Sequence, residues 1–278
     1  VPVEVYVKER TDANLLVEDF MLLANTTVAK FLSKAEKGRG KQSGVYRVHD
    51  KPDLSKLTIL SNVAKRFGYN IAFKDAEQAR DALNNLMGII IQKPEISVLG
   101  RLAVRSMAKA VYTTKNIGHY GLAYEHYTHF TSPIRRYPDV LVHRLLLQTL
   151  LKDRPRYTSE ELEDLCQQSS LMERQSQKAE REAIKYKQVE YLSTRIGEVY
   201  EGIISGVIAR GFFVELVENK CEGMVAMVNM QEDFVYDEEN MRLTGLTTKT
   251  IYQIGESVQV KVSKTSLKDK QIDLEVVG

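Results

Sequence analysis

Two hydrophobic patterns divide the chain near residue 196. Before this point, apolar side chains recur at the three- and four-residue spacing of amphipathic helices. After it, Val, Ile and Phe alternate with polar residues between frequent glycines, which is the pattern of short strands in a small β-barrel. The sequence therefore predicts an α+β protein, with a mainly helical part over residues 1–196 and a barrel over residues 197–278.

Apolar periodicity and capping residues place the helices of the first part. An apolar stripe predicts a helix from Asp12 to Lys37, and Ser159 is expected to cap a long polar helix that extends to about Thr194. Ser132 and Pro133 resemble an N-cap and a first helical residue, so a further helix is expected from there to about Leu151, bent at Pro138. Two or three shorter helices are predicted, at roughly residues 53–68, 75–87 and 95–110, with a strand over residues 45–49.

The first residues, VPVEVYVKERTDAN, alternate valine with other residues and predict a half-buried strand. A strand at this place with no partner nearby leads us to expect that the chain is cut from a larger domain. The Gly-rich basic segment KGRGKQSG, at residues 37–44, lacks the spacing of a phosphate-binding loop, so a solvated surface loop is expected there.

Composition narrows the class of protein. The hydrophobic fraction of 43% suits a globular chain with a core, and a net charge of +2 means that any nucleic-acid site must be a local concentration of Lys and Arg. With only Cys166 and Cys221, a disulfide scaffold is not expected, and a cytoplasmic location follows. No apolar run approaches the ~20 residues of a membrane span.

The densest cluster of candidate chemistry is residues 119–146, HYGLAYEHYTHFTSPIRRYPDVLVHRLL. Arg135 and Arg136 would lie in the first helical turn, where cations oppose the helix dipole and where backbone N–H groups attract anions. They could bind an external phosphate, or they could pair with carboxylates such as Asp139 or Glu173.

Other polar residues in the helical part have structural interpretations as well. The three histidines at positions 119, 126 and 129 lack a recognisable ligand set, so packing and hydrogen bonding are expected of them. Glu173 and Glu180 share one helix face, which could be a solvated, salt-bridged face.

The segment HFTSPIRRYPD followed by HR resembles the hallmark of the RNase II/RNase R family of 3′-to-5′ exoribonucleases. LLVEDFMLLAN, YRVHDKP and QSQKAERE agree in order with family blocks, so the resemblance covers nearly the whole chain. It implies that Arg135 reaches the phosphate next to the scissile bond, that Glu180 lies near the catalytic centre and that Glu18 contacts the 3′-terminal nucleotide.

The segment 197–225 resembles the RNA-binding OB-fold that is repeated in the largest protein of the small ribosomal subunit, which implies a five-stranded barrel. In such barrels aromatic residues stack on bases and nearby cations contact phosphates. The RNA-binding candidates in this part are Arg210, Phe212, Phe213, Lys220, Phe234 and Tyr236. Of the adjacent pair, Phe212 is the preferred stacking residue and Phe213 the preferred core residue. The sequence departs from the type at residues 223–228, where GMVAMV lacks the usual histidine.

The family implies a site for two Mg²⁺ ions held by four aspartates that precede the VEDF-like segment, and no such block occurs in this sequence. We therefore expect the parent protein to be a processive exoribonuclease that releases nucleoside 5′-monophosphates from single-stranded RNA. The 278-residue chain is expected to bind RNA without cleaving it, and a monomer is expected for the full-length protein. A non-catalytic RNA-binding adaptor is the alternative.

Overall fold

The computed structural model describes residues 2–6, 10–36, 43–93, 96–238 and 241–277. Its helical part contains α1 (Asp12–Glu36), α2 (Leu54–Arg66), α3 (Ala76–Ile90), α4 (Ile96–Ser106), α5 (Tyr137–Leu151) and α6 (Ser159–Ser193). Two short strands, β1 (Tyr46–Val48) and β2 (Val111–Thr113), pair antiparallel between these helices. The expected α+β class is confirmed.

A closed five-stranded barrel forms the second part, as expected. Its strands are β3 (Val199–Ile208), β4 (Gly211–Leu216), β5 (Glu222–Ala226), β9 (Ser257–Ser266) and β10 (Gln271–Val276). Between β5 and β9 the chain forms a separate three-stranded sheet of β6 (Phe234–Asp237), β7 (Arg242–Gly245) and β8 (Ile251–Gln253). The sequence pattern did not distinguish this sheet from the barrel.

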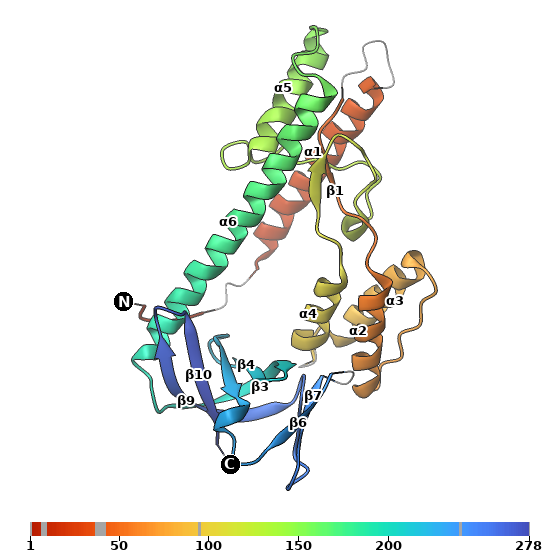
Figure 1. Cartoon of the computed structure of the whole chain (residues 1–278). Coiled ribbons are helices and arrows are strands. Elements are labelled where there is room, and N and C mark those ends of the chain that lie inside the picture. The colour runs from red at the N-terminus through yellow and green to blue at the C-terminus, as the bar shows by residue number, and fades with distance from the viewer. Residues whose placement is uncertain (1, 7–9, 37–42, 94–95, 239–240, 278) are drawn as a thin grey trace.

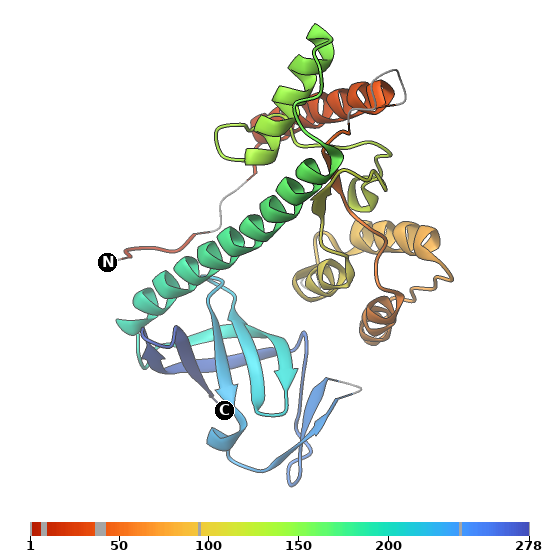
Figure 2. The same ribbon diagram turned by 45° about the horizontal axis from the view of Figure 1, so that its top comes forward.

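Helix α6 connects the two parts. It starts beside α5 and runs to the barrel, with α2, α3 and α4 on the other side of the molecule (Figures 1 and 2). Val189 and Leu192, near its end, are fully buried in the same apolar cluster as the barrel core. Leu162 and Cys166, near its start, are fully buried against α5. One rigid helix therefore carries side chains from the α5 region to the barrel.

Several element boundaries differ from the prediction. Residues 2–6 form no strand, and Val3 and Tyr6 are largely exposed, so the expected N-terminal strand is wrong for the described residues. The N-cap of α6 is Thr158, whose hydroxyl accepts from the backbone of Glu161 in a capping box, one residue before the expected cap. Most of the segment 37–44 lies outside the described residues.

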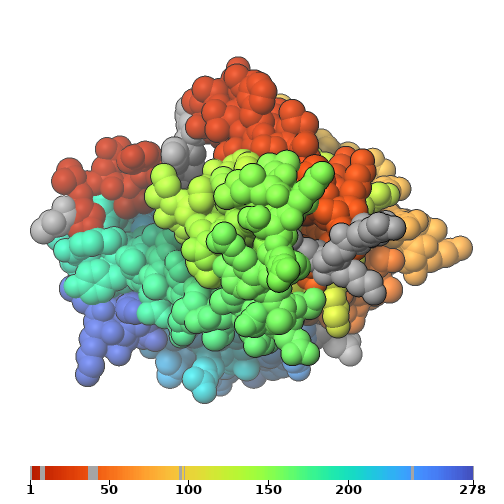
Figure 3. Space-filling model, turned by 90° about the horizontal axis from the view of Figure 1, so that it is seen from above, coloured from red at the N-terminus to blue at the C-terminus, as the bar shows by residue number. Residues whose placement is uncertain are grey.

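Helix α1 buries only part of its apolar stripe. Its second half packs beside α5 (Figure 3), and Ala29 and Leu32 are buried there. Leu16, Phe20 and Leu23, in the first half, are each between 58% and 64% exposed. No helix among the described residues is both long enough and apolar enough to cross a bilayer.

Candidate functional site

The segment that precedes α5 is a turn and not the first part of the helix. The carbonyl of Ser132 accepts hydrogen bonds from the backbone N–H groups of Arg135 (3.3 Å) and Arg136 (3.1 Å). The expected start at Pro133 is therefore wrong, and α5 begins at Tyr137 with Arg136 as its N-cap. A helix from Pro133 would have placed Pro138 in its interior, where the proline ring clashes with the carbonyl four residues before it.

A buried carboxylate holds this turn. Oδ1 of Asp139 accepts from the backbone N–H of Ser132 (2.7 Å) and from Nη2 of Arg136 (2.8 Å). The Asp139 side chain is fully buried and that of Arg136 is 18% exposed. Of the two alternatives for the arginines, Arg136 forms the ion pair with Asp139, through Nη2. Arg136 also lines the cleft beside this turn, and its predicted contact with RNA stays untested.

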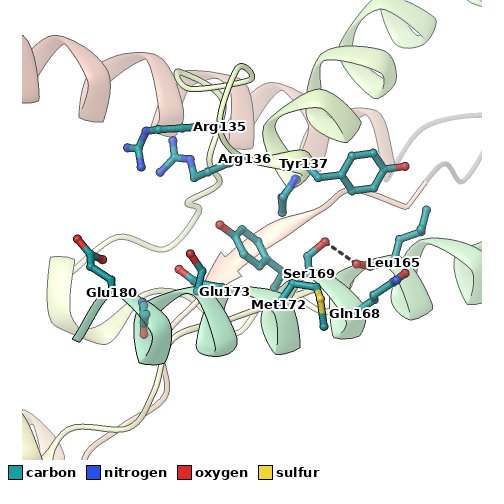
Figure 4. Close-up of a pocket in the computed structure, with 13 residues that line it drawn as sticks. Arg135, Arg136, Tyr137, Leu165, Gln168, Ser169, Met172, Glu173 and Glu180 are labelled. Atoms are coloured by element: carbon teal, nitrogen blue, oxygen red, sulfur yellow. Dashed lines mark hydrogen bonds between the residues drawn. The ribbon is translucent and has the colours of Figure 1, made fainter. Parts of the chain in front are cut away.

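Arg135 has the opposite environment. It lies at the exposed edge of the same turn, and within the described ranges its side chain has no hydrogen-bond or ion-pair partner. Figure 4 shows Arg135 and Arg136 on one side of a gap, with Glu173 and Glu180 of α6 on the other. The clamp on Arg136 thus presents the neighbouring guanidinium toward open space.

The gap is a cleft of about 760 Å³ between the start of α5 and one face of α6. The α6 residues in its wall recur every three or four positions, so they share one helix face. The lining residues are Tyr112, Arg135, Arg136, Tyr137, Pro138, Leu165, Gln168, Ser169, Met172, Glu173, Ser176, Gln177 and Glu180. The structure therefore brings Arg135 and Glu180 to one cleft.

The two glutamates of α6 differ in their partners. Glu173 accepts two hydrogen bonds from Arg47 of β1, at 2.6 and 3.0 Å, and the Arg47 guanidinium lies 4.6 Å from the centre of the Tyr112 ring. This bidentate pair fixes α6 against β1. Glu180 is exposed and has no ion pair with any described residue, so it is the uncommitted carboxylate of the cleft.

Two of the three candidate histidines, His119 and His129, pack and hydrogen-bond as expected. Nδ1 of His129 lies 2.7 Å from the hydroxyl of Tyr112, and His119 stacks on His49 at a centroid distance of 5.1 Å. Burial lowers the pKa of His129 to about 3 and that of His119 to about 4. Burial also raises the pKa of Tyr112 to about 12. These rings are therefore neutral at pH 7.

Glu18 is not brought to the cleft. It lies on the exposed first half of α1, where its carboxylate pairs with Arg10. It is not among the residues that line the cleft with Arg135 and Glu180. The predicted contact of Glu18 with a terminal nucleotide stays untested.

The barrel aromatics take a different register from the predicted one. Phe212 is fully buried and stacks on Tyr252 at 4.8 Å, so its preferred role as the stacking residue is wrong. Phe213 points the other way, is half-buried and lies opposite Met224 of β5. Val214 and Leu216 are buried on the same face as Phe212, and this two-residue period was the signal that the prediction missed.

The remaining barrel candidates fall into two groups. Arg210 is exposed in the β3–β4 turn, and Lys220 is an exposed turn residue whose ammonium lies 3.7 Å from Glu215. Phe234 and Tyr236 lie in β6, where both are half-buried and pack against the barrel core. Phe213 and Arg210 therefore lie at the surface, and the two β6 aromatics have a packing role.

The donor set in the described ranges does not fit a two-metal site. No group of three or more His, Cys, Asp or Glu side chains in those ranges converges in a way that could hold a metal ion. In the cleft the carboxylates of α6 are Glu173 and Glu180, and the first is committed to Arg47. We therefore derive no catalytic step through a metal from these residues.

Two protein families match this chain, one over most of its helical part and one over its barrel. Residues 1–152 match the RNB domain and residues 193–276 match the S1 RNA binding domain. The predicted division at residue 196 falls between α6 and β3 and stays a prediction. Ribonuclease R of Aquifex aeolicus is 38% identical over 99% of this chain and 39% of its own length. The chain thus spans about two fifths of the length of the first curated relatives that it matches.

Solved structures give the same result. The apo form of Mycoplasma genitalium RNase R superposes with a TM-score of 0.86 and 28% identity, over 97% of this chain and 42% of that one. The same enzyme in complex with ribose methylated single-stranded RNA gives a TM-score of 0.85 at 28% identity, with the same coverage. The RNB domain matches residues 1–152, which is more than half of this chain. The chain therefore belongs to the RNB family of ribonucleases and carries an S1 RNA binding domain after its long helix.

Proposed function

We propose that this sequence is an RNA-binding part of a processive 3′-to-5′ exoribonuclease that hydrolyses single-stranded RNA to nucleoside 5′-monophosphates. The observation that carries the proposal is Arg135, an exposed guanidinium on a turn that Asp139 holds fixed, facing Glu180 across the cleft. A guanidinium fork binds phosphate bidentately, and one aimed at a reacting phosphoryl group stabilises developing charge.

Within this proposal, Arg135, Glu180 and the barrel surface have different roles. Arg135 contacts the phosphate next to the scissile bond, and Glu180 lies near the reacting atoms. Phe213 and Arg210 on the barrel surface contact a base and a phosphate further along the strand. The hydrolytic chemistry in this family is expected to use Mg²⁺, and no group of three or more His, Cys, Asp or Glu side chains among the described residues could hold such an ion. We therefore propose that the 278-residue chain alone binds RNA and does not cleave it.

The direct test is incubation of the protein with 5′-labelled single-stranded RNA and Mg²⁺. The nuclease is expected to shorten the labelled RNA progressively from its 3′ end and to release unlabelled nucleoside 5′-monophosphates, whereas the 278-residue chain is expected to bind the RNA without shortening it. Absence of cleavage by any longer natural form of the protein would contradict the exonuclease and favour a non-catalytic RNA-binding adaptor.

The role of Arg135 has its own test in the active nuclease. Arg135→Lys replaces a planar fork with a point charge, so turnover should fall far more than RNA affinity. Equal losses in turnover and affinity would assign Arg135 to docking alone.

A further inference from the structure

A second groove lies on the side of α6 that faces away from the cleft. It is formed by residues 178–185 in the second half of α6 and by the turn between β9 and β10. Glu182 in its wall follows Glu173 by about two and a half helical turns, so the two side chains leave the helix on opposite sides. The groove has a volume of about 590 Å³ and is lined by Lys178, Arg181, Glu182, Lys185, Lys268, Asp269 and Lys270.

Every residue in the wall of this groove is charged, and positive charge dominates. Five are cations and two are carboxylates, a net charge of +3, whereas the whole chain carries +2. The rest of the chain therefore sums to −1, and the excess positive charge of the protein is concentrated at this place. Like charges gathered from two separate elements repel one another, which favours binding of an anion between them.

Internal contacts satisfy only part of this charge. Glu182 pairs with Lys270 at 2.5 Å and lies 3.8 Å from Lys178. Lys185 donates to the carbonyl of Glu222 in the barrel. These contacts fix the β9–β10 turn and the barrel against α6, so the groove has a defined shape.

Besides Lys185, which bonds a backbone carbonyl, two exposed cations of the groove have no carboxylate partner among the described residues. Nε of Arg181 donates to the carbonyl of Gln177 at 3.2 Å, which leaves its two terminal nitrogens without a partner in the described ranges. Lys268 lies exposed at the β9–β10 turn, and its ammonium likewise contacts no described acceptor. Asp269, next to it, is occupied by the hydroxyl of Ser266 at 2.7 Å.

We propose that this groove binds a second stretch of RNA through its backbone phosphates, with Arg181 and Lys268 as the principal contacts. The proposal rests on the proposed RNA-binding function and extends it to a new surface. A protein partner fits less well, because protein interfaces have an apolar core depleted in charge and this wall is entirely charged. Phosphate contacts from Lys and Arg are sequence-independent, so the groove accepts RNA of any sequence.

The groove and the cleft lie on different sides of α6, so they can bind separate segments of RNA. RNA bound here does not occupy the cleft of Arg135, because the helix separates them. The two sites therefore contribute independently to affinity, and the groove holds a strand on the protein while another segment occupies the cleft. Variants at the two sites should have additive effects on the free energy of binding.

The test uses the 278-residue chain and a 5′-fluorescein-labelled single-stranded RNA oligonucleotide, with affinity measured by fluorescence anisotropy at several salt concentrations. The Arg181→Gln, Lys268→Gln double variant removes two phosphate contacts. The slope of log K against log salt should therefore become shallower by about 1.4, since each contact on a single strand contributes about 0.7. Lys65→Gln with Lys74→Gln is the matched control, because these exposed lysines lie on the α2–α3 side of the molecule and cause the same change in net charge.

The outcomes separate this proposal from the one on which it rests. Suppose that the wild-type chain binds RNA and that Arg135→Gln weakens binding, but that the groove variant has the same affinity and salt dependence as the lysine control. The proposal that the groove binds RNA is then wrong, and the proposed function stands. If the wild-type chain shows no salt-dependent RNA binding, both are wrong. Equal melting temperatures for all variants exclude loss of folding as the cause, since the substituted side chains are exposed.

Discussion

Asp139 is predicted to hold the turn that presents Arg135, and its removal should therefore damage both stability and RNA binding. The carboxylate is fully buried and accepts from the Ser132 backbone and the Arg136 guanidinium. Asp139→Ala leaves a largely buried guanidinium without its counter-ion and a backbone N–H without its acceptor. Asp139→Asn keeps an acceptor oxygen at the same position but removes the charge.

The magnitudes follow from burial. Removal of one partner of a buried ion pair costs about 3–5 kcal/mol, so Asp139→Ala should lower the free energy of unfolding by that amount. Asp139→Asn retains a hydrogen bond and should cost about 1–3 kcal/mol. A looser turn must be ordered again when RNA binds, at about 0.5–1.5 kcal/mol, so the affinity of the folded Asn variant should fall roughly 2- to 10-fold.

Urea denaturation followed by circular dichroism measures the first effect, and RNA anisotropy titration measures the second. Asp81→Ala is the control, because Asp81 pairs with Arg80 in an exposed ion pair that should contribute at most about 1 kcal/mol. If Asp139→Ala and Asp81→Ala lose the same stability, the buried clamp does not hold the turn and the reasoning is refuted.

Two further predictions concern the barrel and the histidines. Phe212→Ala should destabilise the barrel by about 3–5 kcal/mol, whereas Phe213→Ala should leave the melting temperature nearly unchanged and weaken RNA binding by about 1–3 kcal/mol; the reverse pattern would restore the original assignment. Because burial lowers the pKa of His129 to about 3 from an ordinary 6.5, the unfolded state binds more protons between these values. Stability should therefore fall as pH drops below about 6.5, by roughly 2 kcal/mol at pH 5 from this group. Urea titrations at pH 7 and pH 5 should show a smaller loss for His129→Asn, and an unchanged loss would contradict the assignment.

The elements that the sequence predicted well are those with a long, regular pattern. Helix α6, with its capping sequence and 35 residues, differs from the prediction by about one residue at each end. The barrel strands follow from two-residue alternation between glycines. In both cases many local signals agree, so a single ambiguous residue cannot change the result.

The errors arose where one local signal competed with another. Ser132 and Pro133 are a good helix start by residue type, but Pro138 and the buried Asp139 impose a turn in front of α5. Phe212 and Phe213 are equivalent by type, so the pair alone does not fix the strand register; the alternation with Val214 and Leu216 indicates which face is buried.

Long-range pairs lay beyond sequence reasoning altogether. Arg47 and Glu173 form a bidentate pair across 126 positions of the chain, and nothing in the short β1 segment identifies Arg47 as a partner of α6. The basic groove is likewise assembled from α6 and the β9–β10 turn, about 90 residues apart, and neither segment alone contains an unusual run of positive charge.

The most direct test of the central claim is the salt dependence of RNA binding by the Arg135→Gln variant of the 278-residue chain, compared with Lys152→Gln as an exposed control. If Arg135 contacts one RNA phosphate, its removal weakens binding at low salt and makes the slope of log K against log salt shallower by about 0.7, while the control leaves both unchanged. An Arg135→Gln variant that is folded and has the affinity and salt dependence of the wild type would contradict the account.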